Sequence, residues 1–297
     1  MPRLLLVSLL LVTACSAAPG GDAAVGRTTV VKTAVEKAAP AKTTELAPKP
    51  VGVPSGVTTG YVVYDRVQKK ITVSRNPHKR FRSASVVKLM IAIDHLERVK
   101  KPDLALLKPM LRVSDDDAAT RLWSLGGQGK IIQRVAKKLK LTDSGPPPTG
   151  KPGFWGYTAI SALDIAKVYR YILEQASPTV RNTIMGQLRQ AGPCGSDGFD
   201  QYFGIPRGVA RPWAVKQGWS GYGTVPPVRC KGNGAAASYT APAPVDFRNA
   251  VLHTTGVVGS GDRYIEVILT TQTSRWSDSV TKITRLARDV HRAALTR

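Results

Sequence analysis

The stretch from Val86 to Leu96 constrains the fold of this chain more than any other segment. Its apolar residues leave almost no polar face, so the sequence predicts a helix that other elements surround on all sides. Ser85 opens this helix, and Lys88 follows three residues later. With 297 residues, the chain is long enough to build a core that encloses such a helix.

Strand patterns stand at both ends of the chain, and helical patterns lie between them. Strands are predicted at 60–64, 71–73, 213–216, 250–258 and 264–271, and further helices at 131–141, 161–175, 178–192 and from Val280 to Val290. Residues 259–262 favour a hairpin turn. This order predicts an α+β fold: a five-stranded antiparallel sheet with terminal helices packed on it, and a mostly helical lobe beside a cleft.

Residues 1–14 have the layout of an export signal peptide. A positive start at Arg3 precedes an apolar run from Leu4 to Val12, and small residues lead to Cys15. Residues 12–15, Val-Thr-Ala-Cys, are similar to a bacterial lipobox, which implies that Cys15 is lipidated and holds the protein on the outer face of the cytoplasmic membrane. The alternative is an ordinary signal and a secreted protein.

A low-complexity segment separates this signal from the periodic part of the chain. Residues 16–56 are rich in Ala, Thr, Pro, Gly and Lys and show neither helical nor strand periodicity, which predicts a disordered tether. The predicted organisation is a signal peptide at 1–14, a lipidated cysteine with its tether at 15–56, and one folded domain at 57–297.

The formal net charge of +23 by itself favours a nucleic-acid partner. Export argues against that partner, because it separates the protein from DNA and RNA. Residues 57–297 hold 37 basic and 17 acidic side chains, so the charge belongs to the folded domain. We therefore expect an anionic membrane surface or anionic wall polymers as partners, drawn by the long-range field of the domain, and we expect a monomer.

With Cys15 assigned to lipid, Cys194 and Cys230 remain as an even pair. Export permits disulfides, so we expect a bridge between them; two free thiols are the alternative. Zinc is not expected, because no Cys/His spacing suits it. The sequence gives no sign of a metal or another cofactor, since its histidines are isolated: His78, His95, His253 and His291.

Ser85 and Lys88 lie on one face of the buried helix. Burial disfavours a charged lysine, which makes Lys88 a plausible base, and the helix start favours negative charge developing on Ser85. Together they have what an activated serine nucleophile needs. The spacing alone is common: Ser279 and Lys282 share it on the terminal helix, where we expect Lys282 to be solvated.

Two later segments extend this pair into a set. Ser114-Asp115-Asp116 opens a segment of the helical region, and Lys216-Gln217-Gly218 ends a strand. The order Ser-x-x-Lys, Ser-Asp-Asn and Lys-Thr/Ser-Gly is typical of penicillin-recognising serine enzymes. With its flanking stretches 81–85 and 156–164, the segment 57–297 resembles the class A β-lactamase-like serine hydrolases of that superfamily.

The resemblance implies a role for each matching residue. Ser85 would attack an acyl carbonyl, Lys88 would take its proton, and Ser114 would relay a proton to the leaving group. The implied substrate-binding residues are Asp116, Lys216, Gln217, Gly218 and Trp219, with Lys216 holding a substrate carboxylate. Backbone N–H groups of Ser85 and Trp219 would form an oxyanion hole.

Three departures from the family pattern concern the chemistry directly. Asp116 stands where asparagine is usual, and a carboxylate near Lys88 would stabilise the ammonium and weaken the base. Gln217 replaces the usual short hydroxyl. Class A β-lactamases also carry an Ω-loop glutamate that activates water, whereas the only acid between Leu141 and Ile160 is Asp143; an acyl-enzyme should therefore persist.

Three functions remain open. The first is an exported serine acyl hydrolase or transferase that works through an acyl-enzyme on Ser85, on cell-wall peptides of the peptidoglycan type or related amides and esters. The second is a true class A-type β-lactamase that hydrolyses β-lactams by another deacylation route. The third is a catalytically weak or inactive binding lipoprotein that keeps the same fold.

Overall fold

A computed structural model describes residues 51–231 and 249–296 of the chain. The predicted signal peptide, the lipidation site at Cys15 and the tether up to residue 50 lie outside the described residues, so these remain predictions. Val51 is already buried, in the apolar cluster beneath the C-terminal helix.

Five antiparallel strands form the main sheet, in the spatial order β2-β1-β7-β6-β5. Their bounds are β1 Val57–Asp65, β2 Lys70–Arg75, β5 Trp213–Ser220, β6 Ala250–Val258 and β7 Tyr264–Gln272. Two short strands, β3 Phe81–Arg82 and β4 Ala159–Ile160, pair beside it. The two ends of the domain thus share one sheet, and the predicted α+β fold is confirmed.

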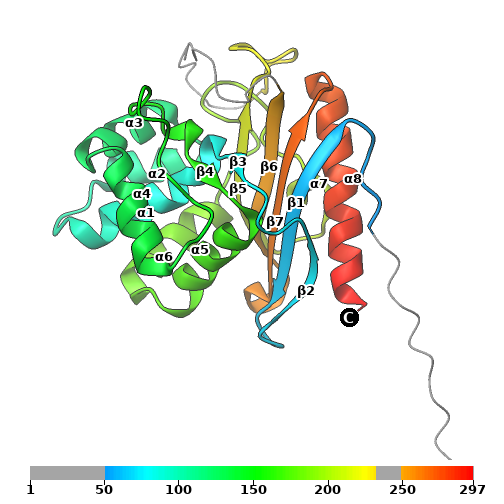
Figure 1. Cartoon of the computed structure of the whole chain (residues 1–297), viewed down its shortest axis with the longest axis horizontal. Helices are drawn as coiled ribbons and strands as arrows, with labels where there is room; N and C mark the ends of the chain where they lie inside the picture. Colours follow the sequence, from blue (N-terminus) through cyan, green and yellow to red (C-terminus); the bar gives the residue numbers. More distant parts are fainter. Residues whose placement is uncertain (1–50, 232–248, 297) are drawn as a thin grey trace, which may run out of the picture. The chain divides into compact units, whose positions relative to one another are not determined.

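Helices lie on both faces of this sheet. The long C-terminal helix α8 runs along one face, and the helical lobe lies on the other side (Figure 1). The helices and helical turns are η1 Ala84–Val87, α1 Lys88–Arg98, α2 Leu104–Arg112, α3 Asp116–Leu125, α4 Gly129–Leu139, η2 Trp155–Tyr157, α5 Ala162–Glu174, α6 Pro178–Arg189, α7 Ile205–Gly208, η3 Ser260–Asp262 and α8 Trp276–Leu295. Within the described ranges, none of them has the length and apolar character to cross a bilayer.

The alternation of side chains along each strand divides the core in two. On β1, Tyr61 and Val63 belong to the cluster shared with α8, whereas Val62 and Tyr64 belong to the cluster shared with the helical lobe. Successive strand residues point to opposite faces, so a strand buried on both faces needs apolar residues at nearly every position. This explains the apolar run from Tyr61 to Tyr64 on β1.

Helix α1 is enclosed, as the sequence predicts. Every residue from Lys88 to His95 is buried, and α1 contacts α2, α3, α4, α5 and α6. Its beginning differs from the prediction, because the turn that contains Ser85 is a 3₁₀ turn, η1, rather than α-helix. The cause lies at Ala84, whose φ of +43° is outside the helical region.

The strand predicted at 213–216 is longer in the structure. β5 continues through Gln217 and Gly218 to Ser220, paired with β6 as far as Val251. The apolar pattern stops after Val215, but hydrogen bonding to β6 and contact with η1 sustain the strand. Cross-strand partners therefore decide where this strand ends, and the local pattern does not show them.

Two other expectations concern the cysteine pair and Lys282. The disulfide between Cys194 and Cys230 is confirmed, with 5.5 Å between the Cα atoms. The expectation that Lys282 is solvated is wrong: its side chain is part-buried and its Nζ donates to Ser274 Oγ at 2.5 Å. Ser274 lies just before the first residue of α8, within reach of this lysine.

His253, at the centre of β6, makes the stability of the fold depend on pH. Its ring is fully buried, with Nε2 bonded to the Arg82 carbonyl at 2.8 Å and Nδ1 accepting from the Thr270 N–H at 3.1 Å. Burial is the main cause that lowers the pKa of His253, to about 4. Between pH 6.5 and 4 the His253 side chain is protonated in the unfolded chain but stays neutral in the folded chain. The free energy of unfolding therefore falls as the pH falls.

We expect the low pKa of His253 to decrease the free energy of unfolding by about 3 kcal/mol between pH 7 and pH 4, since each unit of pKa shift corresponds to about 1.4 kcal/mol. Urea unfolding at several pH values measures it. His253→Gln keeps a donor and an acceptor and should flatten the pH dependence of stability. His78→Gln changes a mostly exposed ring and should leave most of that pH dependence in place. An unchanged slope in His253→Gln would contradict this assignment.

Candidate active site

Lys88 lies at the first position of α1 with none of its side chain exposed. Its ammonium donates to the Ser114 carbonyl oxygen at 2.6 Å, to Ser114 Oγ at 3.2 Å and to Asp116 Oδ1 at 2.5 Å. The Trp155 ring covers it from another side, with the ring centroid 4.5 Å from Nζ. An ammonium has three donors and no acceptor, so every N–H of Lys88 is already engaged within the protein.

Ser114 brings these groups together through an unusual backbone. It lies between α2 and α3 with φ of +57°, a left-handed conformation that costs a non-glycine residue about 1–3 kcal/mol. In this conformation its carbonyl and its hydroxyl both reach Lys88, and Oγ also receives Lys216 Nζ at 2.8 Å. Asp115 then caps α3 with its side chain, which fixes the first turn and with it the position of Asp116.

Lys216 reaches Ser114 from the sheet, on β5, and is 1% exposed. Burial lowers the pKa of Lys216 well below its usual value, and the ammonium of Lys88 lowers it further, while nearby carboxylates oppose the shift. The neutral form of Lys216 is therefore favoured more than in an exposed lysine. A neutral amine can accept as well as donate a proton at Ser114 Oγ.

Ser85 lies in η1, directly beside β5. A Cβ on Gly218 would lie 3.0 Å from Val86 Cγ2 and 3.3 Å from the Ser85 backbone nitrogen, so glycine permits the close approach of strand and turn. The Ser85 side chain is nearly buried, at 6% exposure. Its Oγ makes no hydrogen bond to any residue that the structure describes, and the predicted contact with Lys88 is not formed.

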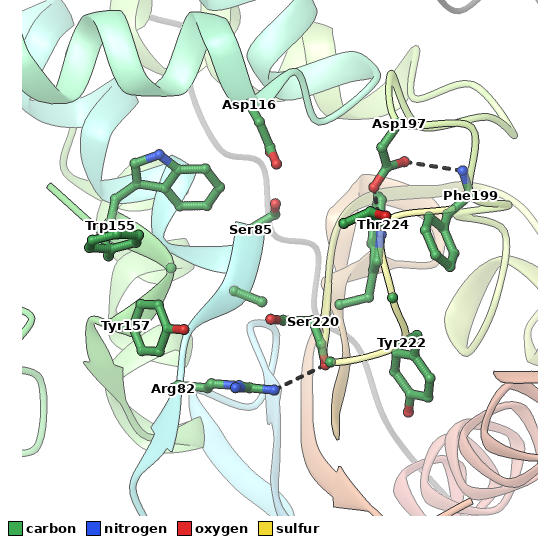
Figure 2. A pocket seen from close by; sticks show the side chains of 16 residues that line it. Arg82, Ser85, Asp116, Trp155, Tyr157, Asp197, Phe199, Ser220, Tyr222 and Thr224 are labelled. Carbon is green, nitrogen blue, oxygen red and sulfur yellow. Dashed lines mark hydrogen bonds between the residues drawn. The ribbon is translucent and has the colours of Figure 1, made fainter. Parts of the chain in front are cut away.

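A cavity of about 210 Å³ opens in front of Ser85. Asp116 enters it from α3 and points toward Ser85, and Asp197 faces it from a loop beside Asp116 in the upper part of the view (Figure 2). Arg82 lies at the lower end of this view and donates to the Ser220 carbonyl at 3.0 Å. Aromatic side chains provide much of the remaining lining: Phe154, Trp155, Tyr157, Phe199, Trp219 and Tyr222.

The structure brings most of the predicted site residues together. The contacts above join Lys88, Ser114, Asp116 and Lys216, and Ser85, Asp116 and Trp219 line the cavity. Gln217 does not line it, because its amide donates to the Phe203 carbonyl at 2.6 Å and to the Gln201 carbonyl at 3.3 Å.

The second Ser-x-x-Lys pair has no comparable surroundings. Ser279 Oγ donates to the Ser274 carbonyl at 3.2 Å, and Lys282 bonds to the hydroxyl of the same residue. Both side chains therefore serve the N-terminal end of α8, and neither lines the cavity in front of Ser85.

Asp143 is directed away from the cavity. Its carboxylate accepts from Ser161 Oγ at 2.7 Å and pairs with His78 at 3.0 Å. Where the segment 141–160 approaches Ser85, it presents Phe154, Trp155 and Tyr157. This wall provides stacking surfaces and no carboxylate.

Asp197 and Trp155 are the functional candidates that the sequence did not reveal. Asp197 accepts from the Phe199 N–H at 3.1 Å and from Trp219 Nε1 at 2.8 Å. Burial is the main cause that raises its pKa. The only local signal for Asp197 is its place in a glycine-rich turn just after Cys194, and a turn of that kind is common in loops without a function.

A named relative shows the family of this chain. The protein named "Putative lipoprotein LppW" from Mycobacterium tuberculosis is 33% identical over 245 residues, which cover 78% of this chain and 69% of that protein. This chain belongs to the LppW family. No family model matches it.

Solved structures show which known fold this chain has. PBP-A matches with a TM-score of 0.58 and 15% identity, over 82% of this chain and 92% of that protein. The class A β-lactamase from Mycobacterium abscessus matches with a TM-score of 0.56 and 16% identity, over 80% and 94%. The fold is that of serine β-lactamases and penicillin-binding proteins, which confirms the predicted resemblance at the level of the fold.

The left-handed backbone of Ser114 predicts an inverted order of stability between two variants. Ser114→Ala and Ser114→Gly remove the same hydroxyl, but glycine adopts φ of +57° without strain. We expect Ser114→Gly to be about 1 kcal/mol more stable than Ser114→Ala in urea unfolding. At Ser124, an exposed position of α3, alanine should instead be more stable than glycine by about 1 kcal/mol. The same order at both positions would refute the strained conformation.

Proposed function

We propose that this LppW-family protein is a serine acyl-transfer enzyme that forms an acyl-enzyme on Ser85. The observation that carries the proposal is the Ser114 hydroxyl, which bonds to two buried lysine amines beside a serine that lines a cavity. Burying two lysine side chains in one place is energetically costly, and perturbed titratable groups of this kind cluster at functional sites. Amides or esters related to cell-wall peptides are the proposed substrates.

The proton balance assigns a part to each group. Ser85 Oγ forms a bond to the acyl carbon while its proton passes to the amine of Lys88, which must first have lost a proton. The bond from the acyl carbon to the leaving nitrogen or oxygen breaks, and Ser114 donates a proton to that atom and is reprotonated by a lysine. The backbone N–H groups of Ser85 and Trp219 would stabilise the oxyanion. Water or a second nucleophile then accepts the acyl group.

Asp116 makes the acylation step slow. Its carboxylate, 2.5 Å from Lys88 Nζ, favours the ammonium form that cannot accept the proton of Ser85. In ligand-free structures catalytic hydrogen bonds are often unformed and tighten only with substrate, so the free Ser85 hydroxyl is compatible with this function.

Slow deacylation argues against an efficient β-lactamase. The stretch 141–160 offers no carboxylate to activate water, since its only acid, Asp143, is bonded to Ser161 and His78. Fast hydrolysis of an acyl-enzyme needs such a base. The β-lactamase alternative would require another route to the same step.

A non-catalytic binding protein is the second candidate. It is favoured by the arrangement of Lys88, whose three donors are engaged by Ser114 and Asp116 while Ser85 has no hydrogen bond among the described residues. Such a protein would use the cavity and keep the polar cluster as structure. Labelling of Ser85 separates the two candidates.

Attachment to the cell envelope is also part of the proposal. The Val-Thr-Ala-Cys sequence ending at Cys15 and the lipoprotein name of the Mycobacterium tuberculosis relative support a lipid-anchored exported protein. An anionic membrane surface and anionic wall polymers would then lie within reach of a strongly basic domain.

Covalent labelling tests the acyl-enzyme. Incubation with p-nitrophenyl acetate, which carries no carboxylate, should add one acyl group per chain slowly, and peptide mapping should place it on Ser85. Penicillin G, whose carboxylate lies beside its scissile amide, should label the same serine more slowly. The adduct should persist, because the segment 141–160 presents no carboxylate to the cavity. Intact-mass spectrometry follows both steps.

Two matched variants serve as controls for this labelling. Ser85→Ala should remove the adduct, and Ser279→Ala, in the second Ser-x-x-Lys pair, should keep it. No adduct with either reagent would favour the binding protein. Rapid loss of the penicillin adduct with many turnovers would favour a β-lactamase.

Asp116→Asn tests the restraint on Lys88. The amide removes the negative charge beside the ammonium, so Lys88 loses a proton more easily and acylation of Ser85 should become about tenfold faster or more. Asp117→Asn removes a charge from the same first turn of α3 at an exposed position and should leave the rate unchanged. Slower or unchanged labelling in Asp116→Asn would show that Asp116 does not suppress the base.

A further inference from the structure

The cavity in front of Ser85 contains a carboxylate without a counter-ion. Asp197 makes no ion pair within the described ranges, although the chain has 43 Lys and Arg against 20 Asp and Glu. The other carboxylate of the cavity, Asp116, is paired with Lys88. In so basic a chain, a carboxylate that faces a cavity without forming an ion pair is a candidate partner for a cationic ligand.

The same cavity offers little to a carboxylate ligand. Lys216 is buried behind Ser114 and does not line it, and the Gln217 amide is bonded to backbone carbonyls elsewhere. Arg82 lines it at the lower end of the view in Figure 2, away from Asp197, where its Nη2 donates to the carbonyls of Ser220 at 3.0 Å and Asn249 at 3.3 Å. A ligand carboxylate at the upper end would meet Asp197 and Asp116, and like charges in a partly buried site repel.

Aromatic rings complete the surroundings that a cation prefers. Trp155 already carries the Lys88 ammonium 4.5 Å from its centroid, Trp219 presents its indole N–H edge to Asp197, and Phe154, Tyr157 and Tyr222 also line the cavity. Ring faces attract ammonium groups, most strongly where water is excluded. Carboxylate and rings therefore select the same kind of group.

Asp197 is held rigidly for such a task. Its Oδ1 and Oδ2 accept from Phe199 N–H and Trp219 Nε1. The turn that carries it is tied to the opposite loop by the Cys194–Cys230 disulfide and by the Cys230 N–H bond to the Gly198 carbonyl at 2.9 Å. A carboxylate accepts about four hydrogen bonds, so lone pairs remain for a ligand.

We propose that this cavity binds an ammonium group through Asp197, and that the substrate of Ser85 is an amide or ester with an amine close to the scissile bond and no carboxylate there. The substrate half of the proposal rests on the acyl transfer proposed above. The ammonium site does not, so it can be tested in a protein without the nucleophile.

Calorimetric titration of the full-length Ser85→Ala protein provides the test, with benzylamine, benzyl alcohol and benzoate as probes of one size and three charges. We expect benzylamine to bind about tenfold tighter than benzyl alcohol or more, as for a charge-assisted hydrogen bond, and benzoate to bind weakest. Adding Asp197→Asn should bring the benzylamine to benzyl alcohol ratio close to one.

Asp200→Asn is the matched control, because Asp200 lies in the same loop, is paired with Arg207 and does not line the cavity; it should keep the tenfold ratio. Benzoate binding as tight as benzylamine, no benzylamine binding in the millimolar range, or an unchanged ratio in Asp197→Asn would each overturn the ammonium site. If Asp197→Asn unfolds, the probe series on Ser85→Ala alone still decides. Failure of Ser85 labelling with a positive titration would overturn the acyl transfer and leave the ammonium site.

Discussion

The arrangement of the site depends on the burial of the Lys88 ammonium. Lys88 belongs to a helix with no exposed face, so water cannot accept its protons and the protein must. The acceptors come from a single short segment, Ser114 to Asp116, and the left-handed Ser114 supplies two of them. The beginnings of α1 and α3 therefore meet at this ammonium, and Asp116 lines the cavity in front of Ser85 from that junction.

Asp116 balances the charge of Lys88. It stands where the family pattern has asparagine, and its carboxylate forms an ion pair with the Lys88 ammonium at 2.5 Å. Lys216 has no carboxylate in contact, and burial lowers its pKa well below the usual value. The two lysines therefore reach the same Ser114 hydroxyl, one with a carboxylate partner and one without.

The sequence predicted what depends on local periodicity and failed where distant contacts decide. The enclosed helix, the helix predicted from residue 161 and the sheet shared by the two ends of the domain follow from spacing along the chain, and the structure has them. The end of β5 depends on pairing with β6, and the backbone of Ser114 depends on a lysine that is remote in sequence. Asp197 became visible only through folding, because its neighbours in the cavity come from other elements.

Charge acts on two length scales in this protein, and the signs differ. The basic excess of the domain repels a small free cation at long range and attracts polyanions, whereas the unpaired carboxylate in front of Ser85 attracts a cation at contact. A diffusing amine would be attracted by the carboxylate at contact but repelled by the basic domain at long range. A polymer that is anionic along its length and carries an amine at the reacting unit gains from both. With the ammonium site proposed above, the combination would favour a zwitterionic polymer over a free amine.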